Sequence, residues 1–270
     1  MKRTLPGFRL TLGVTLIYLG VLLVIPLAVC VLKAAQLGPA AFWAAVWTPR
    51  ARSAYLLTFG ASFAAAAVTS LLGFLIAWVL VRYEWPMKRL VDSLVDLPLA
   101  LPTAVAGLTY SMLYVKNGWF GQFLVPLGIY GTYSRLGIVL VLSFIGLPFA
   151  VRAVQPVLES LEVDAEEAAI LLGANRWQTF WRVILPTLMP AIITGFALSF
   201  ARAIGEYGSV VFISSNIPGK TEIAPMLIAT KLEENSYAEA TAIALVLLVM
   251  SFGMLAVINV LERRSRRYYV

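Results

Sequence analysis

The stretch DAEEAAILLGANRWQTFWRVILPTLMP, residues 164–190, decides how the rest of the chain is interpreted. It carries acids, a central glycine and paired tryptophans, yet it lies between two long apolar stretches. The whole chain of 270 residues is 60% hydrophobic and only 13% charged. Because soluble domains carry about a quarter charged residues, this composition predicts an all-α protein that crosses a membrane several times. The quoted stretch is then a polar interruption outside the membrane.

Six segments are long and apolar enough for membrane-spanning helices, which need about 20 apolar residues each. They cover residues 11–32, 55–81, 94–114, 136–154, 187–213 and 238–260. The third holds Pro98 and Pro102 and is open to a break at its cytoplasmic end. The first is too long for a cleaved signal peptide, whose apolar part has about 7–15 residues. The sequence therefore predicts one domain over residues 1–270.

Lysine and arginine indicate which loops face the cytoplasm. With the N-terminus inside, 13 of them lie in inner loops, 7 in outer loops and Arg202 within a span. The C-terminal stretch ERRSRRYYV is the strongest single anchor. This bias predicts that both termini and the loop 155–186 are cytoplasmic. The basic charge beside apolar spans fits contact with membrane lipid and not with nucleic acid.

The quoted stretch reads as two short helices joined by a tight bend. Leu161, Ala165, Ala168 and Leu172 recur at helical spacing and form one apolar, small-residue face. Gly173 fits a helix C-terminus, where glycine adopts the left-handed conformation most easily. The loop is therefore expected to present a surface that another protein can approach closely.

The second short helix has its own start and stop signals. Asn175 is expected to cap it together with Gln178 three residues later, and Pro186 is expected to end it. Its apolar side is formed by Trp177, Phe180, Trp181 and Ile184. An alternative is that this hairpin lies on lipid. The clustered acids argue against it, because anionic headgroups would repel Glu159, Glu162, Asp164, Glu166 and Glu167.

The sequence EAAILLGANRWQTFWRVILP, from Glu167 to Pro186, resembles the cytoplasmic loop of bacterial ABC importer permeases. The shared pattern is Glu-Ala-Ala, three residues, Gly, nine residues and Ile-x-Leu-Pro, with Val183 in the isoleucine position. The resemblance implies a type I permease fold in the inner membrane, whose loop docks on an ATP-binding subunit. It assigns that coupling role to Glu167, Ala168, Ala169, Gly173 and Pro186.

Two further stretches, DLPLALPTAVAGLTY (96–110) and LSFARAIGEYGSVVFIS (198–214), resemble the T subunit of sulfate/thiosulfate permeases. They resemble molybdate permeases less closely, which leaves a molybdate or tungstate permease as an alternative. The resemblance implies a homologous permease subunit, two ATP-binding subunits and an external sulfate/thiosulfate-binding protein. ATP and Mg²⁺ would be bound by the partner subunits, and this chain would bind no cofactor.

Arg202 and Glu206 are charged residues within the predicted fifth span. A charge at membrane depth costs about 2.5–3.5 kcal/mol on insertion scales, so both should face protein or water. One interpretation is a mutually neutralising structural pair, and the other is an electrostatic contact along an anion pathway. The same two residues could serve an ion relay in a stand-alone secondary anion transporter, a competing hypothesis beside a non-transporting scaffold.

No enzyme site emerges from the sequence. The chain has no histidine, which removes imidazole metal sites and the commonest general base. The stretch PGKT at 218–221 lacks the earlier glycine of a phosphate loop, because Ser214 stands at that position. We therefore expect no catalytic and no metal-binding residues, and ATP hydrolysis by another chain.

Overall fold

The computed structural model describes residues 7–161 and 163–269, and every regular element within these ranges is helical. Inside a bilayer a helix satisfies all its backbone hydrogen bonds internally, which explains this choice for so apolar a chain. The elements are α1 (Phe8–Leu19), η1 (Gly20–Val24), α2 (Ile25–Ala35), α3 (Gly38–Val46), α4 (Pro49–Arg82), α5 (Lys88–Val95), α6 (Leu97–Ala100), α7 (Thr103–Tyr114), α8 (Gly121–Leu124), η2 (Val125–Leu127), α9 (Arg135–Glu159), α10 (Val163–Leu171), α11 (Arg176–Thr179), η3 (Phe180–Ile184), α12 (Leu185–Ile204), α13 (Val210–Ile213), α14 (Ala224–Glu233) and α15 (Tyr237–Tyr269).

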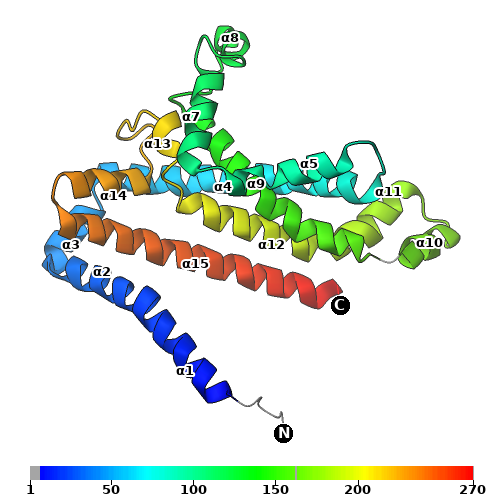
Figure 1. Ribbon diagram of the computed structural model, residues 1–270, viewed down its shortest axis with the longest axis horizontal. Helices are drawn as coiled ribbons and strands as arrows, with labels where there is room; N and C mark the ends of the chain where they lie inside the picture. Colours follow the sequence, from blue (N-terminus) through cyan, green and yellow to red (C-terminus); the bar gives the residue numbers. More distant parts are fainter. Residues whose placement is uncertain (1–6, 162, 270) are drawn as a thin grey trace.

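Four long helices, α4, α9, α12 and α15, lie side by side along the long axis of the molecule (Figure 1). The small helices α10 and α11 lie at one end of this bundle, which we call the hairpin end. Helices α3 and α14 lie at the opposite end, which we call the far end. Because α15 runs from the far end towards the hairpin end, the C-terminus lies on the same side as the hairpin.

Small residues bring α4, α9 and α12 close together. A Cβ added at Gly73 of α4 would lie 2.6 Å from the Cβ of Ala150 in α9. A Cβ at Gly195 of α12 would lie 3.1 Å from the Cα of the same Ala150. Nearby, the buried Ser199 hydroxyl of α12 donates a 3.0 Å hydrogen bond to the Gly146 carbonyl of α9. Such contacts between small residues are the usual basis of helix association in membranes.

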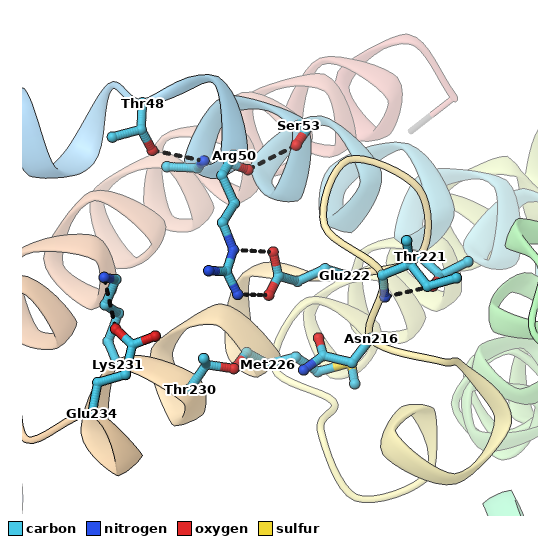
Figure 2. Close-up of polar contacts among 12 residues, drawn as sticks. Thr48, Arg50, Ser53, Asn216, Thr221, Glu222, Met226, Thr230, Lys231 and Glu234 are labelled. Atoms are coloured by element: carbon cyan, nitrogen blue, oxygen red, sulfur yellow. Dashed lines mark hydrogen bonds and ion pairs between the residues drawn. The ribbon is translucent and has the colours of Figure 1, made fainter.

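An ion pair between half-buried Arg50 and buried Glu222 attaches the loop 214–223 to the start of α4 at the far end (Figure 2). Arg50 donates to both carboxylate oxygens of Glu222 over 2.8 and 2.6 Å, and Glu222 is only 1% exposed. In the same region Lys231 donates to Glu234 over 2.9 Å. This hydrogen bond raises the pKa of Lys231 and lowers the pKa of the Glu234 carboxyl.

Within the described residues, five helical runs are long and apolar enough to cross a membrane. They are Phe8–Ala35, Pro49–Arg82, Arg135–Glu159, Arg176–Ile204 and Tyr237–Arg264. Five of the six predicted spans correspond to these runs. The predicted fifth span, 187–213, falls in a helix that starts earlier, at Arg176, and stops at Ile204, so the predicted residues 205–213 lie outside that helix.

The predicted third span, 94–114, is a broken segment. Helix α6 ends at Ala100, and Leu101 is extended with φ −79° and ψ 135°. Pro102 explains the break, because its ring disfavours helical geometry in the preceding residue. Helix α7 then projects sideways from the bundle together with α8 (Figure 1). Its 12 residues are fewer than the roughly 20 that a straight crossing needs.

The N-terminal run from α1 to α2 diverges from the bundle (Figure 1). Helix α2 packs against α15 and α3, but the most apolar window of the run, within Phe8–Ala35, has no buried residue. A chain that exposes so much apolar surface must cover it with lipid or with another protein.

The contact between α4 and α9 predicts that two matched glycine substitutions in α4 change the melting temperature by different amounts. Gly73→Ala should lower the melting temperature of the detergent-purified protein by several degrees, because overpacking costs about 1–3 kcal/mol. Gly60→Ala on the same helix should not, since a Cβ there meets nothing within 4 Å. Thermal unfolding followed by tryptophan fluorescence measures both. Equal melting temperatures for the two variants would contradict the described packing.

Candidate functional site

The candidate site is the helical hairpin at the end of the bundle, and its bend is set by Gly173. Asp164 and Glu166 lie in the first turn of α10, where negative charge favours the helix N-terminus. Gly173 has φ +83°, and the backbone N–H of Ala174 donates to the Ala169 carbonyl over 3.0 Å. This is the left-handed helix terminus predicted for Gly173.

The second arm of the hairpin starts as predicted but continues further. The Asn175 side chain accepts from the Gln178 backbone, and the Gln178 side chain accepts from the Asn175 backbone, each over 2.9 Å. The prediction that Pro186 ends this arm is wrong, because α11, η3 and α12 form one helical run. In η3 the Leu185 N–H donates to the Phe180 carbonyl five residues earlier. This wider turn lets the helix pass the proline, which has no N–H to donate.

The hairpin exposes apolar side chains. Leu171 and Leu172 are 88% and 89% exposed, and Trp177 is 73% exposed. The four apolar residues predicted for the second helix of the hairpin differ in burial: Phe180 and Ile184 are at least half-buried, while Trp177 and Trp181 are exposed. Both tryptophan rings contact the Phe180 ring edge-on. Large exposed apolar side chains on a folded surface mark a contact site for lipid or protein.

The residues assigned to coupling differ in accessibility. Glu167, Ala168 and Gly173 are exposed, whereas Ala169 is half-buried and Pro186 is half-buried within α12. One acid of the predicted cluster is already paired within this chain, because Glu166 forms an ion pair with Arg82 at the end of α4. Glu162 lies outside the described residues. The exposed part of the hairpin surface thus combines small, apolar and acidic groups.

Arg152 of α9 organises a second polar cluster near the hairpin end, which the sequence analysis did not single out. Its guanidinium donates to the Asp92 carboxylate over 2.6 Å and to the Asp96 carboxylate over 2.6 and 3.0 Å. It also donates to the Asp92 backbone carbonyl over 2.9 Å. This cluster holds α5 and the start of the broken third segment against α9.

Arg202 and Glu206 form the pair that one interpretation of the sequence anticipated. Arg202 Nη1 lies 2.5 Å from Glu206 Oε2, and the other Glu206 oxygen accepts the Ser209 N–H over 3.0 Å. Glu206 lies beyond the end of α12 at Ile204, so the prediction that both lie within one helical span is corrected. The Glu206 side chain is 3% exposed and that of Arg202 33% exposed. The carboxylate therefore anchors the turn that leads to α13.

Comparison with known proteins places this arrangement in a class. The family model "Binding-protein-dependent transport system inner membrane component" matches residues 69–267. A solved structure of a bacterial alginate ABC transporter in complex with alginate pentasaccharide-bound periplasmic protein has a TM-score of 0.76. It is 20% identical and covers 95% of this chain and 94% of its own. The fold is that of type I ABC importer permeases.

Two curated relatives are considerably more similar in sequence. "Sulfate transport system permease protein CysT" from Synechocystis sp. (strain ATCC 27184 / PCC 6803 / Kazusa) is 53% identical, over 94% of this chain and 89% of that protein. The protein of the same name from Escherichia coli (strain K12) is 45% identical, over 100% and 97%. The chain therefore belongs to the family of binding-protein-dependent inner membrane transport components, and within it to the CysT permeases.

The Arg202–Glu206 pair predicts unequal effects of two neutral substitutions. Arg202→Gln leaves the buried Glu206 carboxylate without a counter-charge, whereas Glu206→Gln keeps an oxygen for the Ser209 N–H and leaves Arg202 partly in water. Arg202→Gln should therefore lower the melting temperature more than Glu206→Gln.

The loss of unfolding free energy in the double variant should be smaller than the sum of the losses in the two single variants. We expect a coupling energy of about 0.5–3 kcal/mol. Thermal or denaturant unfolding in detergent gives all the values needed for this cycle. Strictly additive losses would show that the two side chains do not stabilise the fold as a pair.

Proposed function

We propose that this chain is the membrane-spanning subunit of an ATP-driven ABC importer that carries sulfate, and thiosulfate with it, into the cytoplasm. The observation that carries this proposal is the similarity to CysT permeases over nearly the whole length of both proteins. The long apolar helices and the polar hairpin at one end of the bundle support it, since an importer needs both a membrane path and a site for its motor.

The hairpin is the proposed docking site of an ATP-binding subunit. Exposed leucines and tryptophans beside the Glu167 carboxylate suit a protein groove better than an anionic lipid surface. In this proposal contact and coupling depend on Glu167, Ala168, Ala169, Gly173 and Pro186. Two ATP-binding subunits bind ATP and Mg²⁺ and hydrolyse the ATP, and this chain acts as a non-catalytic permease.

The proposed orientation places the hairpin end in the cytoplasm of a bacterial cell. The excess of lysine and arginine in the corresponding loops supports it, and so does the basic stretch at the end of α15. Because α15 ends on the hairpin side, this orientation also places the C-terminus inside. The basic residues Lys2, Arg3 and Arg9 support the same side for the N-terminus in this proposal. The far end, with α3 and α14, then faces the outside of the inner membrane.

Two further partners follow from the surfaces that this chain leaves uncovered. The apolar run Phe8–Ala35 and the projecting helix α7 suit a homologous permease subunit packed against them within the membrane. An external binding protein for sulfate and thiosulfate docks at the far end. The alginate transporter in its solved complex has a periplasmic protein of its own, which supports this arrangement by analogy of fold.

In the proposed cycle, ATP binding draws the two hairpins together and opens the spans outward, and hydrolysis resets them. The external protein selects the anion, because a pathway that bound it tightly would not release it. The Arg202–Glu206 pair serves mainly as a structural lock in this proposal. Its partly exposed guanidinium leaves a weaker electrostatic role towards a passing anion.

The positive φ of Gly173 predicts a selective loss of transport. Gly173→Val should reduce ATP-dependent uptake of radiolabelled sulfate by proteoliposomes at least tenfold, because a β-branched residue cannot hold the left-handed bend. The liposomes contain the whole importer and the binding protein. Gly7→Val is the matched control and should leave uptake unchanged, since Gly7 has φ +95° and open surroundings but lies before α1, outside both the hairpin and the far-end loop. Unchanged uptake in Gly173→Val would contradict the proposal.

Three other results would contradict the proposal. Uptake driven by an ion gradient with this chain alone would indicate a secondary transporter. Uptake of molybdate or tungstate in place of sulfate would indicate the related permease, and assembly without uptake of any anion would indicate a scaffold.

The hairpin also predicts a specific crosslink. With the single native Cys30 replaced by Ser, Ala168→Cys should form a crosslink to the ATP-binding subunit in membrane vesicles, because Ala168 is exposed on α10. Lys220→Cys, exposed in the far-end loop, should form none and should react with an impermeant thiol reagent from outside. The opposite labelling pattern would reverse the proposed orientation.

A further inference from the structure

The hairpin is connected to the transmembrane bundle by an ion pair that the function proposed above leaves unexplained. Arg82, the last residue of α4, donates a hydrogen bond to the Glu166 carboxylate in the first turn of α10. The two side chains are 22% and 20% exposed, so water screens them less than it screens a pair on an open surface. Among the residues that the structure describes, the ion pair between Arg82 and Glu166 is the polar side-chain contact between α10 and a spanning helix.

Arg82 also lies against the aromatic ring of Trp78. Its guanidinium carbon lies 5.2 Å from the ring centroid of Trp78, one turn earlier in α4. The Trp78 ring contacts Phe180 of η3 edge-on, with centroids 5.8 Å apart. Arg82 therefore touches the first arm of the hairpin directly and the second arm through Trp78.

The polarity of the two helices matches the charges of this pair. A cation is favoured at the C-terminus of a helix and an anion at the N-terminus. Arg82 lies at the C-terminus of α4, and Glu166 lies in the first turn of α10. A planar guanidinium can stack on a ring and donate to a carboxylate at the same time, which a lysine ammonium does less well. The chemistry of each side chain thus suits its position.

We propose that Arg82 is a positioning residue that transmits the movement of α10 to α4 through its ion pair with Glu166. This inference rests on the proposed coupling role of the hairpin. The neighbouring Glu167 is exposed and available to the ATP-binding subunit, whereas Glu166 turns inward to Arg82. Of these two consecutive carboxylates, Glu167 thus faces the proposed ATP-binding subunit and Glu166 faces the transmembrane bundle. Displacement of α10 pulls on the end of α4, the 34-residue helix that reaches the far end.

The test compares sulfate uptake with ATP hydrolysis in proteoliposomes that contain the complete importer and the binding protein. Arg82→Glu and Glu166→Arg should each reduce the number of sulfate ions taken up per ATP hydrolysed at least fivefold. The double exchange should restore this ratio in part, to at least twice that of either single variant, because it rebuilds the pair with reversed charges. Recovery stays incomplete, because the reversed charges oppose the helix polarity and the arginine no longer lies over Trp78. Glu166→Gln, which keeps the shape of the side chain, should reduce the ratio about threefold.

Lys88 and Glu84 provide matched controls at the same end of the molecule. They form a 2.7 Å ion pair that does not touch the hairpin, and Glu84 is 87% exposed. Lys88→Glu changes the loop charge as much as Arg82→Glu does, so it controls for altered membrane orientation, and it should leave the ratio unchanged. Co-purification of the ATP-binding subunits with every variant reports whether the complex assembles.

The outcomes separate this inference from the proposed function. A wild-type importer that takes up no sulfate would overturn the proposed function and the inference with it. The inference alone would be overturned if the wild-type importer takes up sulfate and the single charge reversals and Glu166→Gln all keep its ratio of sulfate taken up to ATP hydrolysed. The inference is likewise overturned if the assembled double exchange stays as uncoupled as the single variants. Recovery in the double exchange supports it.

Discussion

The close approach of α4, α9 and α12 around Ala150 is the constraint on which the rest of the structure depends. Gly73 and Gly195 face this one residue from two different helices: a Cβ at Gly73 would clash with it, and a Cβ at Gly195 would be a tight fit. Lipid tails are as apolar as leucine, so helices in a bilayer associate through close van der Waals contact and not through a hydrophobic drive. This contact holds the three helices together, and the hairpin and the far-end loop are attached to their ends.

Helix α4 connects those two ends. It has 34 residues, which corresponds to a length of about 50 Å at 1.5 Å per residue. An arginine lies near each of its ends, and each is paired with an acid from a much later part of the chain: Arg50 with Glu222 and Arg82 with Glu166. The far-end loop and the hairpin are thus both attached by ion pairs to the same helix, α4.

The same pairing bears on anion transport. Four arginines within the long helices are neutralised by carboxylates of this chain, namely Arg50, Arg82, Arg152 and Arg202. The formal charge of +7 already subtracts these carboxylates, so the excess of positive charge comes from residues other than these four arginines. For a protein that must release its cargo, a path without strong unpaired cations is an advantage, because a tightly held anion would block it.

The sequence by itself determined the features that depend on neighbouring residues. Gly173 ends a helix because glycine alone adopts positive φ without strain, and Asn175 caps the next helix because Gln178 is three residues away. The apolar composition likewise determined long membrane helices and a polar hairpin between two of them. Within that hairpin, however, the sequence could not separate inward Phe180 from outward Trp181, since apolarity alone does not say what a side chain contacts.

Only the tertiary structure decided the features that depend on residues distant in sequence. Glu166 reads as one of five clustered acids, and its partner Arg82 is 84 residues away. Glu206 reads as part of a span, but it lies past the helix end and anchors the next turn. The wider π-helical turn before Pro186 and the sideways course of α7 also escaped prediction. The partner of Glu166 comes close only when the chain folds. The partners of Glu206 and of the π-helical turn are local, but apolar composition alone does not say where a helix ends or widens.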